Sequence, residues 1–259
     1  MSSPNKLAPV MFEPGSHMPT TSFTRKLESI ASLSAEEKEA IRKLPAHVMA
    51  IKADQDIARQ GDRPFRTCFI VEGVTCTYKI ARESRRQIVG FQFRGDAPDL
   101  QSIHLPTLDI SIATLTPSVI GFIQHVHLHE LCTRMPGVAT ALWRHCLIDA
   151  AVFREWMTSI GQRSARGRIS HLLCEIYVRS RAVGLAKDSK IPFPITQLEI
   201  GDALGMSAVH VNRSVQYLRR NQLVALSDGT LEILDWPGLQ REGDFSDEYL
   251  NLSEYFPPK

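Results

Sequence analysis

One segment near the C-terminus, residues 196–221, constrains the fold more than any other part of this chain. Thr196 with Glu199 three residues later is a capping box, a pattern with which helices begin. Gly205 allows a sharp turn, and Ser207 can cap the amide groups of a second helix. The segment therefore predicts two short helices joined by a tight glycine turn, which is the helix-turn-helix arrangement.

Apolar residues are spaced so that each of these two helices has one face to bury. The apolar positions are Ile200, Ala203, Leu204 and Met206 in the first helix and turn, and Val211, Val215 and Leu218 in the second helix. Ala203 is small, so the second helix can cross close above it. An ordinary helical hairpin inside a larger domain remains the alternative interpretation.

The second helix carries charge of one sign only. Between Ser207 and Arg220 there are three arginines and no acidic residue, as neutralisation of DNA phosphates requires. The second helix of a helix-turn-helix enters the major groove, where its N-terminal residues contact base edges. We therefore expect double-stranded DNA as a partner. The predicted DNA-contacting residues are Thr196, Gln197, Ser207, Ala208, Val209, His210, Asn212, Arg213 and Arg219.

Side-chain chemistry assigns roles to some of these residues. Arg213 can offer its guanidinium as a fork to N7 and O6 of guanine, which is worth about 1–3 kcal/mol of discrimination. Backbone amides near Thr196 and Ser207 can hold phosphates, because both residues lie at helix N-termini. Downstream, Asp228-Gly229 lies between two short apolar runs and predicts a hairpin, which would be the wing of a winged helix.

Short runs of β-branched and aromatic residues dominate the chain between Val48 and about Gln124. The predicted strands cover residues 68–71, 75–80, 87–93, 111–115 and 119–123. Many short strands at regular spacing indicate a sandwich or barrel. Two helices precede them, at about residues 23–31 and 34–44, and Ser34 with Glu37 forms a capping box at the start of the second.

A long helix is predicted at about residues 137–162, where Gly161 is the only glycine after the first position and proline is absent. Apolar residues recur along it in steps of three, four and seven, a spacing that favours a coiled-coil dimer seam. A core helix of a single domain is the alternative. The predicted seam consists of Val138, Leu142, Cys146, Phe153, Trp156 and Ile160. A further helix is expected at about residues 166–182.

Composition narrows the class of protein. The 259 residues carry a net charge of +2, so any basic DNA-binding surface must be local. No apolar run is long enough to span a bilayer and no signal-peptide pattern opens the chain, so we expect a cytoplasmic protein without a membrane partner. The five cysteines are widely spaced without a CxxC, which predicts reduced thiols rather than disulfides or a zinc knuckle.

Over most of residues 23–240 the chain resembles the Crp/Fnr family of bacterial transcription regulators. The resemblance is carried by residues 59–62, 69–73, 197–201, 205–207 and 211–213. It implies an α+β chain with an N-terminal cyclic-nucleotide-binding-like β-roll (a jelly roll), a long dimerisation helix and a C-terminal winged helix-turn-helix. It also implies a homodimer whose DNA-binding domains respond to an effector in the β-roll, or to a redox or haem centre. RNA polymerase would be a partner of an activator.

Departures from the family pattern limit the cofactor. Cyclic-nucleotide binders of the family carry a Gly-Glu pair for the ribose and a downstream arginine for the phosphate. Here Gly95-Asp96 is followed by Ala97-Pro98-Asp99-Leu100, and residues 108–115 contain no arginine. A buried cyclic phosphate would lack its cationic partner, so cyclic AMP and cyclic GMP are not expected. No cysteine precedes Cys68, so the iron–sulfur cluster of another branch is not expected either. We predict no cofactor and leave an unknown effector open.

The recognition helix also departs from the family. Ala208 and Val209 stand where cyclic-AMP-type members carry Arg and Glu, whereas Arg213 matches. The half-site should therefore share one guanine contact with the family and differ elsewhere.

A histidine-rich run offers an alternative function. If residues 125–130 formed a strand, His125 and His127 would point to the same side and could share a metal, with Cys132 nearby. This would suit a cupin-like metal-binding enzyme. The run lacks the glycine-rich leader and the second histidine motif of such enzymes, so we favour a protein that is not an enzyme and holds no metal.

Together these observations predict the following division of the chain: a mobile N-terminal arm at residues 1–21, a β-roll sensor domain at 22–136, a dimerisation helix at 137–163, a winged helix-turn-helix at 164–240 and an acidic tail at 241–259. We expect a homodimer to bind a palindromic site whose half-sites are about one helical turn apart. The Gly15–Met18 stretch resembles a cloning scar, and a native segment is the alternative.

Overall fold

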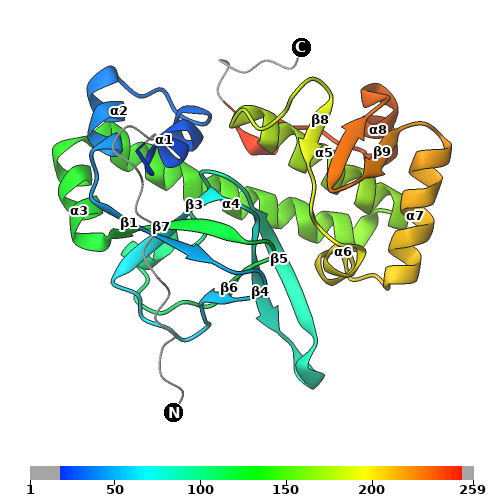
Figure 1. Cartoon of the computed structure of the whole chain (residues 1–259), viewed down its shortest axis with the longest axis horizontal. Helices are drawn as coiled ribbons and strands as arrows, with labels where there is room; N and C mark the ends of the chain where they lie inside the picture. Colours follow the sequence, from blue (N-terminus) through cyan, green and yellow to red (C-terminus); the bar gives the residue numbers. More distant parts are fainter. Residues whose placement is uncertain (1–17, 253–259) are drawn as a thin grey trace. The chain divides into compact units, whose positions relative to one another are not determined.

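The computed structural model of the chain describes residues 18–252, which fall into two compact units (Figure 1). The first unit contains residues 18–77 and Phe91–Cys146, and the second contains Tyr78–Gly90 and the chain from Leu147 onward. The division falls inside the longest helix, α4 (Pro136–Gln162). The architecture is the predicted α+β fold, with a β-sheet unit, a long helix and a C-terminal helical unit that carries a small sheet. The Gly15–Met18 stretch lies outside the described residues except for Met18.

Two short helices open the described chain. They are α1 (Thr21–Glu28) and α2 (Ala35–Arg42). The predicted capping box of α2 is confirmed, because the Glu37 amide donates to Ser34 Oγ at 3.2 Å and the Ser34 amide donates to Glu37 Oε2 at 2.8 Å. In α1, Lys26 Nζ lies 2.8 Å from Asp96 Oδ1, and both side chains are buried.

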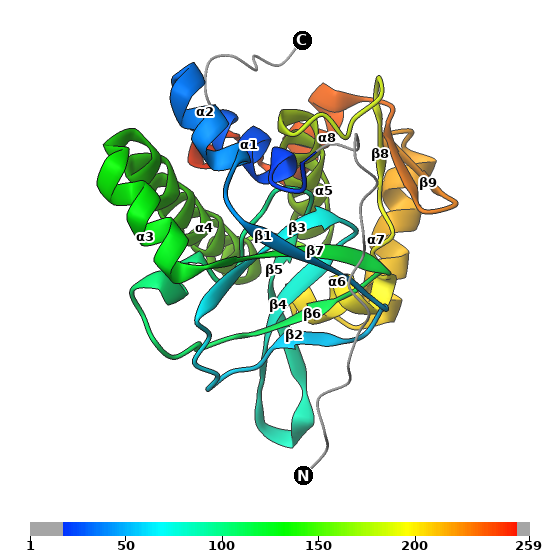
Figure 2. The same ribbon diagram turned by 60° about the vertical axis from the view of Figure 1, so that its left-hand side comes forward.

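Seven strands form two sheets. An antiparallel sheet has the order β1-β7-β3, with β1 at Ala46–Ile51, β7 at Ser118–Gln124 and β3 at Arg66–Glu72 (Figure 2). The other has the order β2-β6-β4-β5, with β2 at Asp56–Ala58, β6 at Ser111–Thr114, β4 at Thr75–Ile80 and β5 at Arg86–Gln92. All five predicted strands are confirmed. Strands β1 and β2 were not predicted, because β1 contains Ala, His and Met, and β2 has only three residues.

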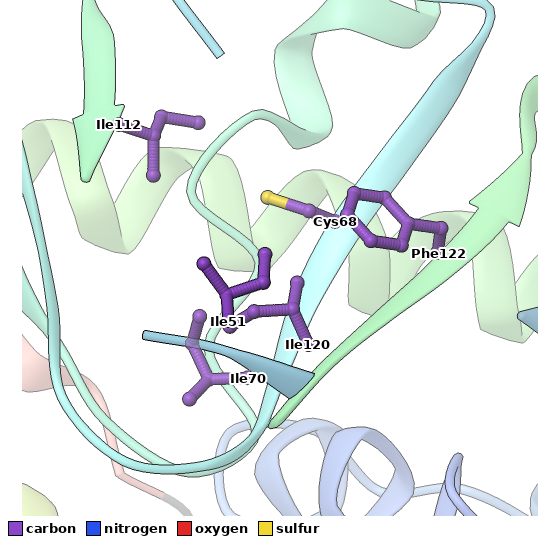
Figure 3. Packing of buried hydrophobic residues seen from close by; sticks show 6 residues of the cluster. All are labelled: Ile51, Cys68, Ile70, Ile112, Ile120 and Phe122. Atoms are coloured by element: carbon purple, nitrogen blue, oxygen red, sulfur yellow. The ribbon is translucent and has the colours of Figure 1, made fainter. Parts of the chain in front are cut away.

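The core of the first unit lies between these sheets (Figure 3). The buried cluster consists of Ile51, Cys68, Ile70, Ile112, Ile120 and Phe122, with Met49, Ile57 and Ala58 packed against it. Ile112 comes from β6, and the other cluster members come from β1, β3 and β7. Alternate residues of β7 contribute, which is the period-two pattern of a strand with one face buried. Two short 3₁₀ segments, η1 (Arg82–Ser84) and η2 (Leu100–Ile103), connect strands.

The histidine-rich run forms a helix, α3 (His125–Arg134), not a strand. The expectation that His125 and His127 lie on one side is therefore wrong, since residues two apart on a helix project in nearly opposite directions. His125 Nε2 lies 3.0 Å from Ser102 Oγ, and the His129 ring packs edge-on against His104. No cluster of three or more metal-ligating side chains occurs in residues 18–252. The buried residues of this run are Leu128 and Leu131, three positions apart as on a helix, and not every second residue as on a strand.

The second unit is built around α5 (Ala165–Ala182), which starts at the cap residue Ser164. The remaining elements are β8 (Lys190–Pro192), α6 (Gln197–Leu204), α7 (Ala208–Arg220), β9 (Val224–Ser227), β10 (Thr230–Ile233), α8 (Trp236–Gly243) and η3 (Glu248–Leu250). The three strands form a sheet of order β8-β10-β9. Strand β8 and helix α8 were not predicted.

The described part of the acidic tail, residues 241–252, packs back on α5 and completes a buried polar network. Glu175 in α5 is fully buried, and its carboxylate accepts three hydrogen bonds: from Trp156 Nε1 of α4 at 3.0 Å, from the Tyr249 hydroxyl at 2.8 Å and from Arg179 at 3.0 Å. Burial lowers the pKa of His171, whose ring lies beside Phe245 and Tyr249. A buried carboxylate is stable only when such partners compensate for its lost hydration.

We expect Tyr249→Phe to lower the free energy of unfolding of this unit by about 1–3 kcal/mol, because the buried carboxylate of Glu175 loses one of its donors. Urea unfolding followed by tryptophan fluorescence measures this, since Trp156 and Trp236 belong to the same unit. Tyr217→Phe is the matched control: the Tyr217 ring packs under the guanidinium of Arg166 at 4.1 Å, and this contact survives the change. Equal unfolding midpoints for the two variants would contradict the prediction.

Candidate nucleic-acid interface

Helices α6 and α7 form the predicted helix-turn-helix. The capping box of α6 is confirmed: the Thr196 amide donates to Glu199 Oε2 at 2.6 Å, and the Glu199 amide donates to Thr196 Oγ1 at 3.3 Å. Gly205 ends α6 in the left-handed conformation, with φ of 65°, which glycine adopts without a steric penalty. Ser207 then caps α7 by accepting from the His210 amide at 3.3 Å.

The close approach between helix and turn occurs at Gly201. A β-carbon on Gly201 would lie 2.5 Å from the carbonyl oxygen of Met206, a distance that a real side chain does not tolerate. Ala203, which we expected to permit the close crossing, is fully buried. A glycine inside a helix costs about 1 kcal/mol relative to alanine, so Gly201 within the predicted helix is itself a signal of a close backbone contact.

The inner face of α7 is confirmed. Val211, Val215 and Leu218 are all buried, and α7 packs against both α5 and α6. Arg168 of α5 donates to the carbonyl of Leu204 at 3.2 Å, which satisfies one of the carbonyls left open at the end of α6. The helix is therefore held on one side and open on the other.

Every predicted DNA-contacting residue lies on the open side. Thr196, Gln197, Ser207, Ala208, Val209, His210, Asn212, Arg213 and Arg219 are all exposed. Val209 is 60% exposed, although the other valines of α7, Val211 and Val215, are buried. The structure also brings together two of these residues from different helices, because Asn212 Nδ2 donates to Gln197 Oε1 at 3.1 Å.

A three-stranded sheet lies next to α7 in the chain. The predicted hairpin is confirmed as β9 and β10, with Asp228 (φ 50°) and Gly229 (φ 68°) both left-handed at the turn. This is the backbone shape that a two-residue hairpin requires. Strand β8 adds to the other edge of β10 in antiparallel register. Asp228 and Gly229 are exposed, as expected for a wing.

The apolar residues of α4 divide between two faces. Val138, Leu142 and Trp156 of the predicted seam are buried within this chain, so they are not free to meet a partner. Cys146 and Ile160 are half-buried, and Phe153 is exposed. The spacing of apolar residues does not distinguish the stripe that covers the chain's own core from the stripe left exposed, so the predicted seam contains residues of both.

An exposed apolar stripe remains on α4. Its large exposed side chains are Trp143 (70%), Leu147 (55%), Phe153 (46%) and Met157 (61%). With Cys146, Ala150 and Ile160, they recur at steps of three and four along the helix, which places them on one face. Single exposed apolar residues are ordinary, whereas a continuous stripe indicates a contact surface.

The cysteine thiols are suited to a structural role. None of the five cysteines, all of which lie within residues 18–252, forms a disulfide. Burial raises the pKa of Cys68, Cys132 and Cys174, which keeps these thiols protonated and poorly nucleophilic. Among the described residues, no helix combines the length and hydropathy needed to cross a membrane.

Known proteins resemble this chain along most of its length. The family described as "Crp-like helix-turn-helix domain" matches residues 167–242. Transcriptional activator protein FnrL of Cereibacter sphaeroides is 27% identical over 205 residues, which are 76% of this chain and 80% of that protein. Nitrogen fixation regulation protein FixK of Bradyrhizobium diazoefficiens is 25% identical over 232 residues, which are 87% of this chain and 94% of that protein.

Solved structures share the fold. The structure of FixK2 from Bradyrhizobium japonicum has a TM-score of 0.70 at 21% identity and covers 76% of this chain and 97% of that one. A CRP-family transcriptional regulator from Thermus thermophilus has a TM-score of 0.59 at 19% identity, with 76% and 97% covered. These likenesses include both the β-sheet unit and the helical unit.

Proposed function

Because this chain belongs to the Crp/Fnr family of transcription regulators, which are DNA-binding proteins and not enzymes, we propose that it binds a palindromic DNA site as a homodimer. One α7 helix would enter the major groove of each half-site. The observation that carries the proposal is the face of α7: its inner side is buried, while Val209, Asn212 and Arg213 are exposed together near its N-terminus. The cupin-like alternative is excluded by the same family membership.

We propose a separate role for each domain. We assign sensing to the β-roll at residues 22–136, dimerisation to the helix at 137–163 and DNA binding to the winged helix-turn-helix at 164–240. The tail at 241–259 follows, and its Tyr249 donates to Glu175. Similarity to proteins named as transcriptional activators supports an activating role, in which RNA polymerase would be a second partner. Arg213 supplies the guanine contact, and Arg219 supplies a phosphate contact.

The dimer is supported by the exposed stripe of α4. We revise the seam to Trp143, Cys146, Ala150, Phe153, Met157 and Ile160, flanked by Leu147. At 1.5 Å per residue this stripe is about 26 Å long, enough for more than two heptads of a coiled coil. A two-fold dimer uses the same surface on both copies, and two equivalent recognition helices about 34–36 Å apart read an inverted repeat.

We propose that the β-roll does not bind a cyclic nucleotide, because the chain lacks the Gly-Glu pair and the downstream arginine that would hold one. A hollow of about 310 Å³ in the first unit is lined by residues that include Asp62, Arg66, Asp99 and Phe122. Burial raises the pKa of the Asp99 carboxyl to about 6, although the Cys68 amide donates to it at 2.8 Å. Asp99 therefore brings a buried carboxyl to the hollow, which Arg63 and Arg66 also line. The Arg66 guanidinium is stacked 4.0 Å from the Phe122 ring.

We also propose that the protein binds no iron–sulfur cluster through N-terminal cysteines. The first cysteine of the sequence is Cys68, and it is buried in the core cluster of the β-roll. A cluster needs several thiolates close together, whereas burial and the Asp99 carboxylate raise the pKa of Cys68.

Selection of DNA fragments by the purified protein, at a fixed salt concentration near physiological, tests the function. We expect an enriched inverted repeat with half-sites about one helical turn apart. Arg213→Ala should weaken binding by about 1–3 kcal/mol and relax base preference at one position per half-site. Arg219→Ala should weaken all sequences alike, because a phosphate contact carries no base information. Equal loss of discrimination in both variants would contradict this division.

The dimer seam is tested by Phe153→Asp, which places a charge in the apolar stripe and would bury it against the partner. We expect the mass measured by analytical ultracentrifugation to fall toward that of one 29.0 kDa chain, and DNA affinity to fall with it. Thr158→Asp adds the same charge at an exposed position on another face of α4 and should leave the dimer intact. A dimer unaffected by Phe153→Asp would place the interface elsewhere.

Cyclic AMP should leave DNA affinity unchanged when added to the full-length protein at up to about 1 mM, a concentration well above the micromolar range. The reason is that the chain lacks both the Gly-Glu pair and the downstream arginine, in residues 108–115, that hold a cyclic nucleotide. Titration of a labelled operator by fluorescence anisotropy, with and without the nucleotide, measures this. A saturable increase with a micromolar midpoint would show that the hollow accepts cyclic phosphates after all.

A further inference from the structure

We infer that Gln197 is a positioning residue for base recognition: it orients the side-chain amide of Asn212 so that Asn212 reads adenine. Base choice at one position of each half-site would then depend on both helices of the helix-turn-helix. The inference rests on the proposed function, in that α7 must lie in the major groove. Beyond that function, the base that Asn212 recognises would be adenine, and Gln197 would fix the orientation of the Asn212 amide.

The structural basis is a hydrogen bond between the two helices. Asn212 Nδ2 donates to Gln197 Oε1 at 3.1 Å, across 15 residues of sequence, and both side chains are exposed. Asn212 precedes Arg213 in the N-terminal half of α7. It is therefore among the residues that such a helix presents to base edges.

The backbone that carries Gln197 is held in place. Gln197 is the first residue of α6, directly after the cap residue Thr196, whose side chain and amide both bond to Glu199. The separation between α6 and the start of α7 is fixed by the contact at Gly201, where the Met206 carbonyl approaches the helix. The acceptor oxygen of Gln197 thus projects from a defined position, and the amide of Asn212 is pre-oriented before DNA arrives.

The chemistry of the amide then selects the base. An asparagine amide has two N–H donors and one oxygen acceptor. Gln197 uses one N–H, which leaves the second N–H and Oδ1 free. Adenine presents an acceptor at N7 and a donor at N6 in the major groove, which these two groups match in a bidentate pair. Guanine presents acceptors at both N7 and O6, so the Asn212 oxygen would face another oxygen.

Orientation matters because a free exposed amide rotates. Without the bond to Gln197, Asn212 would have to be ordered at the moment of binding, which lowers affinity for the matching base. Gln197 could instead donate its own amide to a phosphate, as residues at helix N-termini often do. That role would be independent of sequence, and this difference makes the two roles separable by experiment.

The test is a competition binding experiment with the full-length protein and its selected operator, in which each half-site position is changed to the other three bases. Asn212→Ala should remove a preference for adenine of roughly 5- to 100-fold at one position. Gln197→Ala should reduce the preference at that same position by about 3- to 10-fold, and leave the other positions unchanged. The double variant should behave like Asn212→Ala alone, because the two residues act as a unit.

Gln197→Glu is the conservative control. Glutamate retains an acceptor oxygen at the same reach, so the adenine preference should survive, while the added negative charge weakens binding to all sequences alike. All of these positions are exposed, and unchanged unfolding midpoints would verify that the variants fold.

The outcomes separate the two proposals. If the wild-type protein selects no inverted repeat, the proposed function fails. If it selects one but Gln197→Ala retains the full adenine preference, or lowers affinity for every sequence equally, the positioning role of Gln197 is wrong while the function stands. The role of Asn212 is overturned if Asn212→Ala changes no base preference.

Discussion

The buried carboxylate of Glu175 is the constraint on which the second unit depends. A fully buried negative charge is tolerated only while several donors hold it, and its three donors come from α4, from α5 itself and from the C-terminal tail. The end of the long helix, the central helix of the DNA-binding unit and the tail are therefore fixed to one another by a single side chain. The inner face of α7 packs on this assembly, so the orientation of the recognition surface within the unit follows from it.

Local signals in the sequence correctly predicted helix starts and turns in both units. The capping boxes at Ser34 and Thr196, the left-handed turn at Gly205 and the hairpin at Asp228-Gly229 each depend on a few neighbouring residues, and all were found in the structure. Features that depend on distant parts of the chain were not predicted. The aromatic residues of the acidic tail predict that it packs back on the winged domain or the barrel, but they do not identify Glu175 as the partner of Tyr249. The histidine-rich run was given the period of a strand, although its buried leucines follow that of a helix.

The candidate site shows the same division between local and distant information. Charge and spacing along α7 identified the residues that the structure leaves exposed, but the bond between Gln197 and Asn212 could not be predicted, because it depends on how closely two helices cross. Trp156 shows the same limit on α4: its apolar ring fitted a seam by spacing, whereas its indole N–H is used inside the chain. The spacing of apolar residues identifies apolar faces of a helix. Which of these faces stays exposed and can bind a second subunit depends on how the folded chain packs.

The separation of α7 into a buried face and an exposed face has a consequence for how such a regulator evolves. Residues that hold the helix in place, such as Val211 and Leu218, are distinct from those that meet the base pairs, so recognition can change by point mutation without loss of the fold. A bonded pair such as Gln197 and Asn212 restricts that freedom, because a change in one partner alters the other. At the base that such a bonded pair recognises, a change in the operator should therefore require changes in both residues. At the other bases, single substitutions in the protein should be enough.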